Sequence, residues 1–175
     1  MANPQEEFSK IYDQYINKIY RFILLRVNSQ DAAEDLTSET FIRGWRRFEQ
    51  LQSQIENIQA FLFQIARNLV VDYYRNKSRT AVVSADSVSV IDPRPNLEEI
   101  SQKKSDLDLI KAGLANLKEE YQEAVILHYI EDLSIAEIAD ITGKSEGAMR
   151  VTLHRGLKAL QDEIQNCNKN ANLTS

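Results

Sequence analysis

This sequence has little of what secreted and membrane proteins need. Its 175 residues contain one cysteine, Cys167, so an internal disulfide is excluded and a reducing cytoplasm is the expected compartment. No apolar run approaches the about 18 residues that read as a membrane span. The first residues, "MANPQEEFSK", lack the basic and apolar segments of a secretory signal. Five glycines and three prolines leave few breaks between helical patterns, so we expect a cytoplasmic, all-α protein without a membrane span.

Patterns typical of catalysis and cofactor binding are also missing. The chain contains no glycine-rich phosphate loop and no nucleophile elbow. The spacings of His128, His154 and Cys167 match no zinc pattern, and His128 in "VILHYI" is expected to pack in a core. We therefore expect no enzyme activity, no cofactor and no metal.

Two amphipathic helices are predicted at the start of the chain. Apolar residues recur at intervals of three and four from Phe8 to Ile23, with Arg26 after them. The break "NSQD" follows, with Asn28 or Ser29 available to cap a second helix over residues 31–48. That helix has acidic residues in its first turns and basic ones in its last, which complements the helix dipole.

A third helix, "IQAFLFQIARNLVVDYYRNKSR", carries more apolar residues than one face can hold. Its core stripe runs from Ile58 through Leu69 to Tyr73, but Phe63, Val70 and Tyr74 lie off it. Two interpretations remain open at this point. The off-stripe side chains are buried on a second side of the helix, or they form an aromatic platform for a ligand.

The composition changes between residues 79 and 98. This stretch is rich in serine and small residues, and Pro93 and Pro95 force an extended backbone. We interpret residues 79–105 as a flexible linker between two small helical domains, residues 1–78 and 106–165. The alternation in "AVVSADSVSVI" would also fit a strand, but no partner strand is evident. The polar tail, residues 166–175, is expected to be disordered.

A helix-turn-helix is predicted in "EIADITGKSEGAMRVTLHRGLKAL". Ser134 and Glu137 have the spacing of a capping box at the start of a short helix. Gly143 suits the left-handed residue that ends that helix, and Ser145 suits the cap of a second, longer helix. A short helix, a turn with glycine and a longer helix make up this DNA-binding motif.

The second helix of this motif has one apolar and one basic face. At roughly 100° per residue, Met149 and Leu153 fall on the core side and Val151 falls at the centre of the opposite, basic side. A valine there gains nothing on a merely solvated helix. On a recognition helix it contacts a thymine methyl, while Arg150 or Arg155 reaches guanine or phosphate. The alternative is an ordinary surface helix with one stray valine.

The charge of the second half is unevenly divided. Residues 142–160 hold four basic residues against one acidic residue, a net charge of +3, whereas residues 106–141 hold two against nine, a net of −7. The whole chain has a formal net charge of −5. Attraction to phosphates supplies most non-specific DNA affinity. Because residues 106–141 are strongly acidic, we expect the free protein to bind DNA weakly. The charge pattern therefore favours a protein that another molecule brings to DNA.

Three stretches together resemble bacterial sigma factors of the extracytoplasmic-function (ECF) group of the sigma-70 family. They are "DAAEDLTSETFIRGWRRF", "AFLFQIARNLVVDYYRNK" and "LSIAEIADITGKSEGAMRVTLHRGLKAL", and the resemblance covers residues 6 to about 163. It implies a subunit that binds core RNA polymerase and directs promoter-specific transcription initiation. The implied partners are the β′ clamp helices and β flap of polymerase, promoter DNA and an anti-sigma factor.

The resemblance also implies roles for individual residues, with sigma region 2 in the N-terminal domain and region 4 in the C-terminal one. The implied polymerase contacts are Asp35, Ser38, Glu39 and Thr40. The implied contacts to the melted −10 element are Phe63, Arg67, Asn68, Tyr74, Arg75 and Lys77, which combine stacking surfaces with basic groups. The implied contacts to the −35 duplex are Lys144, Ser145, Gly147, Ala148, Arg150, Val151, Thr152, His154, Arg155 and Lys158. Val151 and Thr152 depart from the serine and the basic residue common in the family, which leaves the promoter preference open.

Two other hypotheses fit parts of the sequence. One is a free-standing helix-turn-helix regulator whose N-terminal half binds a ligand or dimerises. The other is a helical scaffold whose basic strip is simply solvated.

Overall fold

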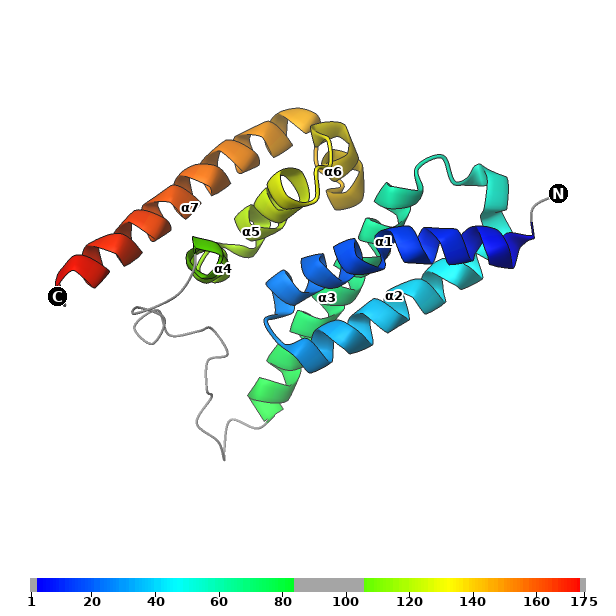
Figure 1. Cartoon of the computed structure of the whole chain (residues 1–175), viewed down its shortest axis with the longest axis horizontal. Coiled ribbons are helices and arrows are strands. Elements are labelled where there is room, and N and C mark those ends of the chain that lie inside the picture. Colours follow the sequence, from blue (N-terminus) through cyan, green and yellow to red (C-terminus); the bar gives the residue numbers. More distant parts are fainter. Residues whose placement is uncertain (1–2, 84–105, 174–175) are drawn as a thin grey trace. The chain divides into compact units, whose positions relative to one another are not determined.

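The computed structural model describes residues 3–83 and 106–173, which form two compact units (Figure 1). Every regular element in these two ranges is helical, in agreement with the predicted all-α fold. Residues 84–105, which contain most of the predicted linker and most of "AVVSADSVSVI", lie outside the described residues. None of the described helices is long and apolar enough to cross a membrane.

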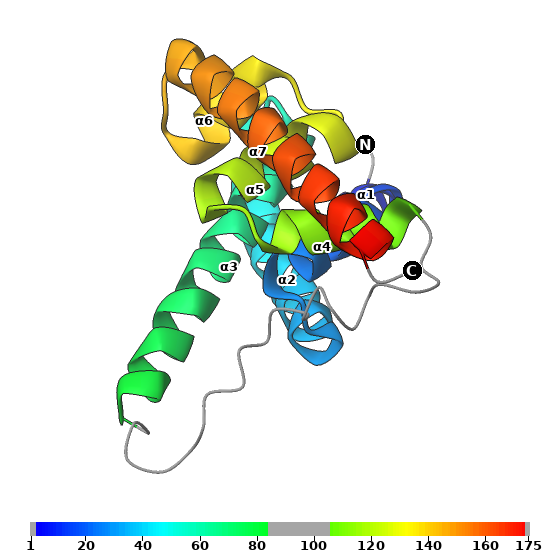
Figure 2. The same ribbon diagram turned by 90° about the vertical axis from the view of Figure 1, so that its left-hand side faces the viewer.

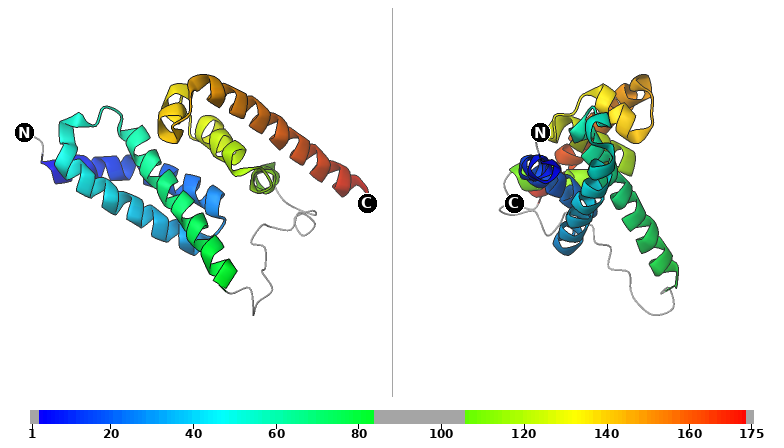
Figure 3. Two further views of the ribbon diagram at one scale, coloured as in Figure 1. Left: turned by 180° about the vertical axis from the view of Figure 1, so that it is seen from behind. Right: turned by 90° about the vertical axis from the view of Figure 1, so that its right-hand side faces the viewer.

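Three long helices build the N-terminal unit. They are α1 (Pro4–Val27), α2 (Gln30–Leu51) and α3 (Ile58–Val83), with a short 3-10 turn, η1 (Gln52–Gln54), after α2. α1 and α2 lie side by side and antiparallel, and α3 crosses them (Figure 3). α3 extends five residues beyond position 78, where we expected the domain to end. The apolar core of this unit includes Ile19, Phe22, Ile23, Phe41, Phe48, Leu62, Phe63 and Val70.

The two candidate cap residues, Asn28 and Ser29, both act in the connection between α1 and α2. Asn28 ends α1 in the left-handed region, with φ 52°, and its N–H donates to the carbonyl of Leu24 at 2.9 Å. Ser29 begins α2, because its hydroxyl accepts the N–H of Ala32 at 3.3 Å. One residue therefore stops a helix and the next starts another, which makes the antiparallel turn short.

The C-terminal unit is built around its last helix. The elements are α4 (Asp106–Ala115), α5 (Glu119–Val125), a π-helical turn η2 (Ile126–Ile130), α6 (Ile135–Thr142) and α7 (Glu146–Leu173). α7 packs against α5 and α4 (Figure 2). A Cβ added to Gly156 would lie 3.1 Å from Val125 Cγ2 and 3.2 Å from Tyr121 Cβ, so this glycine allows α5 and α7 to approach closely.

The end of α7 differs from our expectation. We expected disorder from residue 166, but the helix continues to Leu173. No proline and no glycine follow Gly156, and each asparagine lowers helix stability by only a fraction of 1 kcal/mol, about 0.7 kcal/mol at most. A helix that is already formed also lengthens without a new nucleation cost.

Candidate nucleic-acid interface

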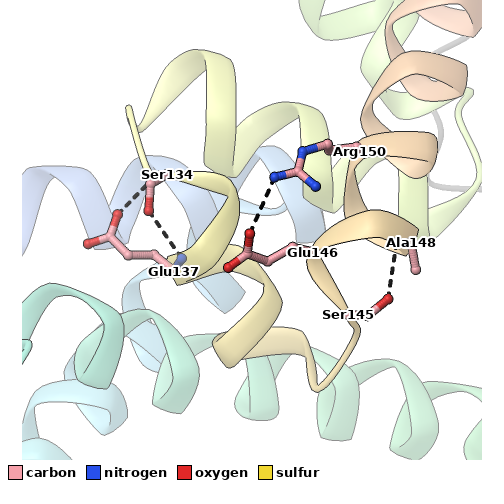
Figure 4. A network of polar contacts seen from close by, with 6 residues as sticks. All are labelled: Ser134, Glu137, Ser145, Glu146, Ala148 and Arg150. Atoms are coloured by element: carbon pink, nitrogen blue, oxygen red, sulfur yellow. Dashed lines mark hydrogen bonds and ion pairs between the residues drawn. The ribbon is translucent and has the colours of Figure 1, made fainter.

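Local caps fix the start of α6 and the turn between α6 and α7 in the helix-turn-helix (Figure 4). The Ser134 hydroxyl accepts the Glu137 N–H at 3.1 Å, and the Glu137 carboxylate accepts the Ser134 N–H at 2.8 Å. This confirms the predicted capping box. Gly143 ends α6 with φ 75°, and the Ser145 hydroxyl accepts the N–H of Ala148 at 3.1 Å to begin α7. The turn is thus set by local hydrogen bonds that the sequence specifies.

The entry into α6 has a feature that the sequence did not signal. After η2 (Ile126–Ile130) the N–H of Leu133 donates to the carbonyl of Leu127 at 3.0 Å, and Asp132 adopts φ 58°. The His128 ring closes this turn, because its Nδ1 lies 2.8 Å from the Leu133 carbonyl. Since a carbonyl only accepts, Nδ1 donates. His128 is half-buried and serves the fold of the turn.

The two faces of α7 lie as predicted. Met149 and Leu153 are buried, with 1% and 5% of their surface exposed, whereas Val151 is 48% exposed. The basic side chains of Arg155 and Lys158 are exposed on the same side as Val151, and so is His154. An exposed valine therefore lies among basic groups, an arrangement that is compatible with contacts to a thymine methyl and to phosphates.

Thr152 is the exception on this helix. We predicted it at the flank of the reading face, but only 9% of its surface is exposed. Its hydroxyl donates to the carbonyl of Ala148 at 3.0 Å, within its own helix. A side chain that faces the core and is bonded internally does not present a group to DNA, so the predicted −35 contact by Thr152 is wrong.

Two basic groups near the start of α7 form ion pairs. Lys144 Nζ lies 3.2 Å from the Glu120 carboxylate of α5. Arg150 Nη2 lies 3.3 Å from the Glu146 carboxylate one turn earlier, a pair that Figure 4 shows. All four side chains are more than one third exposed. Such pairs are worth at most about 1 kcal/mol and are weakened by salt, so they exchange readily for other partners.

The α3 residues that lie off its core stripe are either buried on a second side of the helix or at least partly exposed, and the structure shows both cases. Phe63 is fully buried and meets Phe22 edge to face with ring centroids 5.6 Å apart, and Val70 is also fully buried. The predicted stacking role of Phe63 is therefore wrong, because its ring has no free face. Arg67 is half-buried and Asn68 is exposed.

The C-terminal half of α3 retains an aromatic and basic surface. The half-buried Tyr74 donates its hydroxyl proton to the carbonyl of Arg26, which fixes its ring. Arg75 and Lys77 are exposed, and Lys77 Nζ lies 5.9 Å from the ring centroid of Tyr73. The spacing of Tyr73 predicts a core position, but its side chain is only half-buried. Its position four residues before a lysine was the available sign of a surface role.

The polar residues of α2 lie on different sides. Asp35 and Ser38 are exposed, and Glu39 is half-buried with its carboxylate 2.7 Å from Nε of Arg43. Thr40 is fully buried, and its hydroxyl donates to the Leu36 carbonyl at 2.7 Å. The predicted polymerase contact by Thr40 is therefore wrong, because that face of α2 packs inside the unit.

A groove between α1 and α2 adjoins the exposed polar residues. Its volume is about 380 Å³, and it is lined mainly by apolar side chains. The lining residues are Phe8, Tyr12, Ile16, Ser38, Phe41, Ile42, Trp45 and Arg46. Tyr12 and Ile42 are 44% and 46% exposed at its rim. We missed this surface, although Ile42 and Trp45 follow Ser38 at the four- and seven-residue spacing of one helix face.

No metal-like cluster is present in the described parts of the chain. Within residues 3–83 and 106–173, no three histidine, cysteine or acidic side chains gather as ligands. Burial, and to a lesser extent the nearby Glu163 carboxylate, raise the pKa of the Cys167 thiol. A raised pKa keeps the thiol protonated and unreactive at neutral pH.

Comparison with known proteins matches each unit to one family region. Residues 11–80 match the model for sigma-70 region 2, and residues 107–160 match the model for sigma-70 region 4. The chain belongs to the sigma-70 family. In the terms of this family, α1–α3 are region 2, and α4 to the middle of α7 are region 4.

Relatives of this chain are sigma factors of the ECF group. It is 35% identical over 161 residues to the ECF RNA polymerase sigma factor BldN of Streptomyces coelicolor, an alignment that covers 91% of this chain and 61% of BldN. It is 27% identical over 152 residues to the ECF RNA polymerase sigma factor SigM of Bacillus subtilis, covering 87% of this chain and 91% of SigM. The chain thus spans about three fifths of BldN and nine tenths of SigM.

A solved structure shares the fold. The sigma factor RpoE of Bartonella quintana, crystallised in complex with the anti-sigma factor NepR, matches with a TM-score of 0.74 and 24% sequence identity. The match covers 91% of this chain and 98% of that chain.

Proposed function

We propose that this chain is a dissociable, non-enzymatic sigma factor of the ECF group that acts in the cytoplasm. It binds core RNA polymerase and directs transcription initiation at specific promoters. The observation that carries this proposal is the basic reading face of α7 on an acidic region 4, in a chain that also contains region 2. Since phosphate attraction dominates DNA affinity, such a face needs polymerase to hold it at DNA.

The α7 face would read the −35 duplex. Gly147 supports this role because it is exposed and an added Cβ would meet nothing within 4 Å. Glycine inside a helix costs stability relative to alanine, so an unneeded glycine here suggests that a partner approaches the backbone closely. The proposed contacts are Lys144, Ser145, Gly147, Ala148, Arg150, Val151, His154, Arg155 and Lys158.

The exposed side of α3 would bind the melted −10 strand. Arg75 and Lys77 would follow the sugar–phosphate backbone, and the half-exposed ring of Tyr73 would offer a surface for a base. Asn68 lies exposed on the same helix and would contribute polar contacts. Arg67 and Tyr74 are proposed with them, with the Tyr74 ring oriented by its bond to the carbonyl of Arg26.

The exposed side of α2 would dock on the β′ clamp helices. Asp35, Ser38 and Glu39 would supply polar contacts, and Ser38 also lines the apolar groove. An apolar centre with a polar rim is the usual anatomy of a protein interface. Ile42, 46% exposed at the groove, would be its apolar anchor.

Two further partners complete the proposal. Region 4 would contact the β flap of polymerase, which would place α7 at the −35 element. An anti-sigma factor would control the chain, as the resemblance implies. RpoE, the structural neighbour, is held by the anti-sigma factor NepR in its crystal.

Reconstituted transcription tests this proposal. The full chain would be added to core polymerase on a genomic template, with Arg155→Glu as a matched variant altered on the exposed α7 face. We expect initiation at discrete promoters with the native chain and a loss of those starts with the variant. If the native chain and core enzyme initiate nowhere, the proposal fails. The free regulator hypothesis instead requires tight operator binding without polymerase.

A further inference from the structure

Lys144, a basic residue beside α7, forms an ion pair with a carboxylate of another helix, α5. Lys144 lies in the turn before α7, and its Nζ is 3.2 Å from the Glu120 carboxylate near the start of α5. The two residues are 24 positions apart in the chain, so this is a tertiary contact. The Arg150–Glu146 pair, by contrast, joins neighbouring turns of one helix.

We propose that Glu120 competes with DNA phosphate for Lys144 and so weakens binding of the free protein to any duplex. This inference rests on the proposed function, which places Lys144 at the −35 duplex. Because the competing contact is made with phosphate, the penalty does not depend on base sequence. Glu120 therefore acts as a built-in restraint on DNA binding outside the polymerase complex.

The position of Lys144 suits a phosphate contact. It lies directly before the N-terminus of α7, where the unpaired N–H groups and the helix dipole favour an anion. The Glu120 carboxylate supplies negative charge near the same place. DNA binding must exchange this intramolecular anion for a phosphate, and the exchange returns less free energy than pairing a solvated lysine would.

The exposure of the pair argues against a structural role. The side chains of Lys144 and Glu120 are 37% and 51% exposed. Exposed pairs of this kind shift an equilibrium by at most about five-fold and are screened by salt. That strength suits a restraint that can be overcome. When polymerase holds region 4 at the promoter, the high effective concentration of DNA compensates for a loss of this size.

A double-mutant cycle on the full chain measures the competition directly. Binding to a fluorescent duplex of random sequence would be followed by anisotropy at about 50 and 200 mM salt, a range over which phosphate contacts weaken strongly. The variants are Glu120→Gln, Lys144→Ala and the double substitution. Glu119→Gln is the matched control, because it removes the same charge one residue away. Thermal melting checks that each variant is folded.

We expect Glu120→Gln to bind about two- to five-fold more tightly than the native chain at the lower salt, and more tightly than Glu119→Gln. In the Lys144→Ala background, Glu120→Gln and Glu119→Gln should have equal effects, since the group competed for is gone. The gain should shrink at the higher salt. If Glu120→Gln and Glu119→Gln change the duplex affinity of the native chain equally, the proposal is overturned.

One more variant separates this inference from the proposed function. Arg155→Glu alters the reading face without touching Glu120. If Arg155→Glu weakens binding but the cycle shows no coupling, only the role of Glu120 is refuted. If Arg155→Glu leaves both duplex binding and promoter-directed transcription unchanged, the reading role of α7 is itself refuted.

Discussion

Replacing Gly147 with alanine separates the stability of α7 from its function. The added methyl group meets nothing within 4 Å, so the folded chain accommodates it without movement. Alanine is favoured over glycine in a helix by about 0.5–1 kcal/mol, and we take the lower value because residue 147 lies in the first turn. For a unit of this size, 0.5 kcal/mol raises the melting temperature by about 2–4 °C.

The same methyl group should weaken promoter recognition. If the DNA backbone approaches Gly147 closely, the substitution forces the two apart, and overpacking of this kind costs about 1–3 kcal/mol. We therefore expect a five-fold or greater loss of promoter-directed transcription from a more stable protein. The assay is thermal melting followed by circular dichroism, alongside run-off transcription with core polymerase.

Gly156→Ala is the matched control on the same helix. Its Cβ would lie 3.1 Å from Val125 Cγ2 and 3.3 Å from the Tyr121 carbonyl oxygen, so it should lower stability rather than raise it. Unchanged transcription by a stabilised Gly147→Ala variant would show that no DNA approaches this position. A lower melting temperature for Gly147→Ala would refute the open space around it.

Three further predictions address other parts of the molecule. Val151→Ser should relax the preference at one thymine-containing position of the −35 element, measured by selection from a randomised promoter. Because the residue is exposed, the free energy of unfolding should change by no more than about 0.5 kcal/mol, and clear destabilisation would place Val151 in the core. Ile42→Asp and Asp35→Arg should each abolish pull-down of core polymerase without lowering the melting temperature, and retention of polymerase by both would refute docking on α2. Asp132→Gly should stabilise region 4 by up to about 1 kcal/mol, because Asp132 has φ 58° and glycine adopts that region freely; denaturant unfolding showing a loss instead would mean that the aspartate side chain holds the turn.

The helix ends were predictable from sequence because their chemistry is local. Ser134 and Glu137 bond to each other's backbone across three residues, and Gly143 supplies the left-handed residue that ends α6. The faces of α7 followed from the helical period for the same reason, since Met149 and Val151 lie about 200° apart on the helix. The three motif stretches placed regions 2 and 4 in the correct order.

Residues whose surroundings come from other helices were misplaced. Phe63 lies off the main stripe of α3 but is buried against Phe22 of α1, a contact that no spacing within α3 reveals. Thr40 and Thr152 are polar, yet each satisfies its hydroxyl within its own helix and so can face a core. The groove beside Ile42 was missed because α1 supplies three of its eight lining residues, and no spacing within α2 reveals them.

The central claim is that α7 reads DNA only when polymerase holds it there. Footprinting of the full chain on its promoter, with and without core polymerase, tests this claim most directly. We expect protection of the −10 and −35 elements with core polymerase and none with the chain alone at the same concentration. Sequence-specific protection of the −35 element by the chain alone would contradict the claim and favour a free-standing regulator.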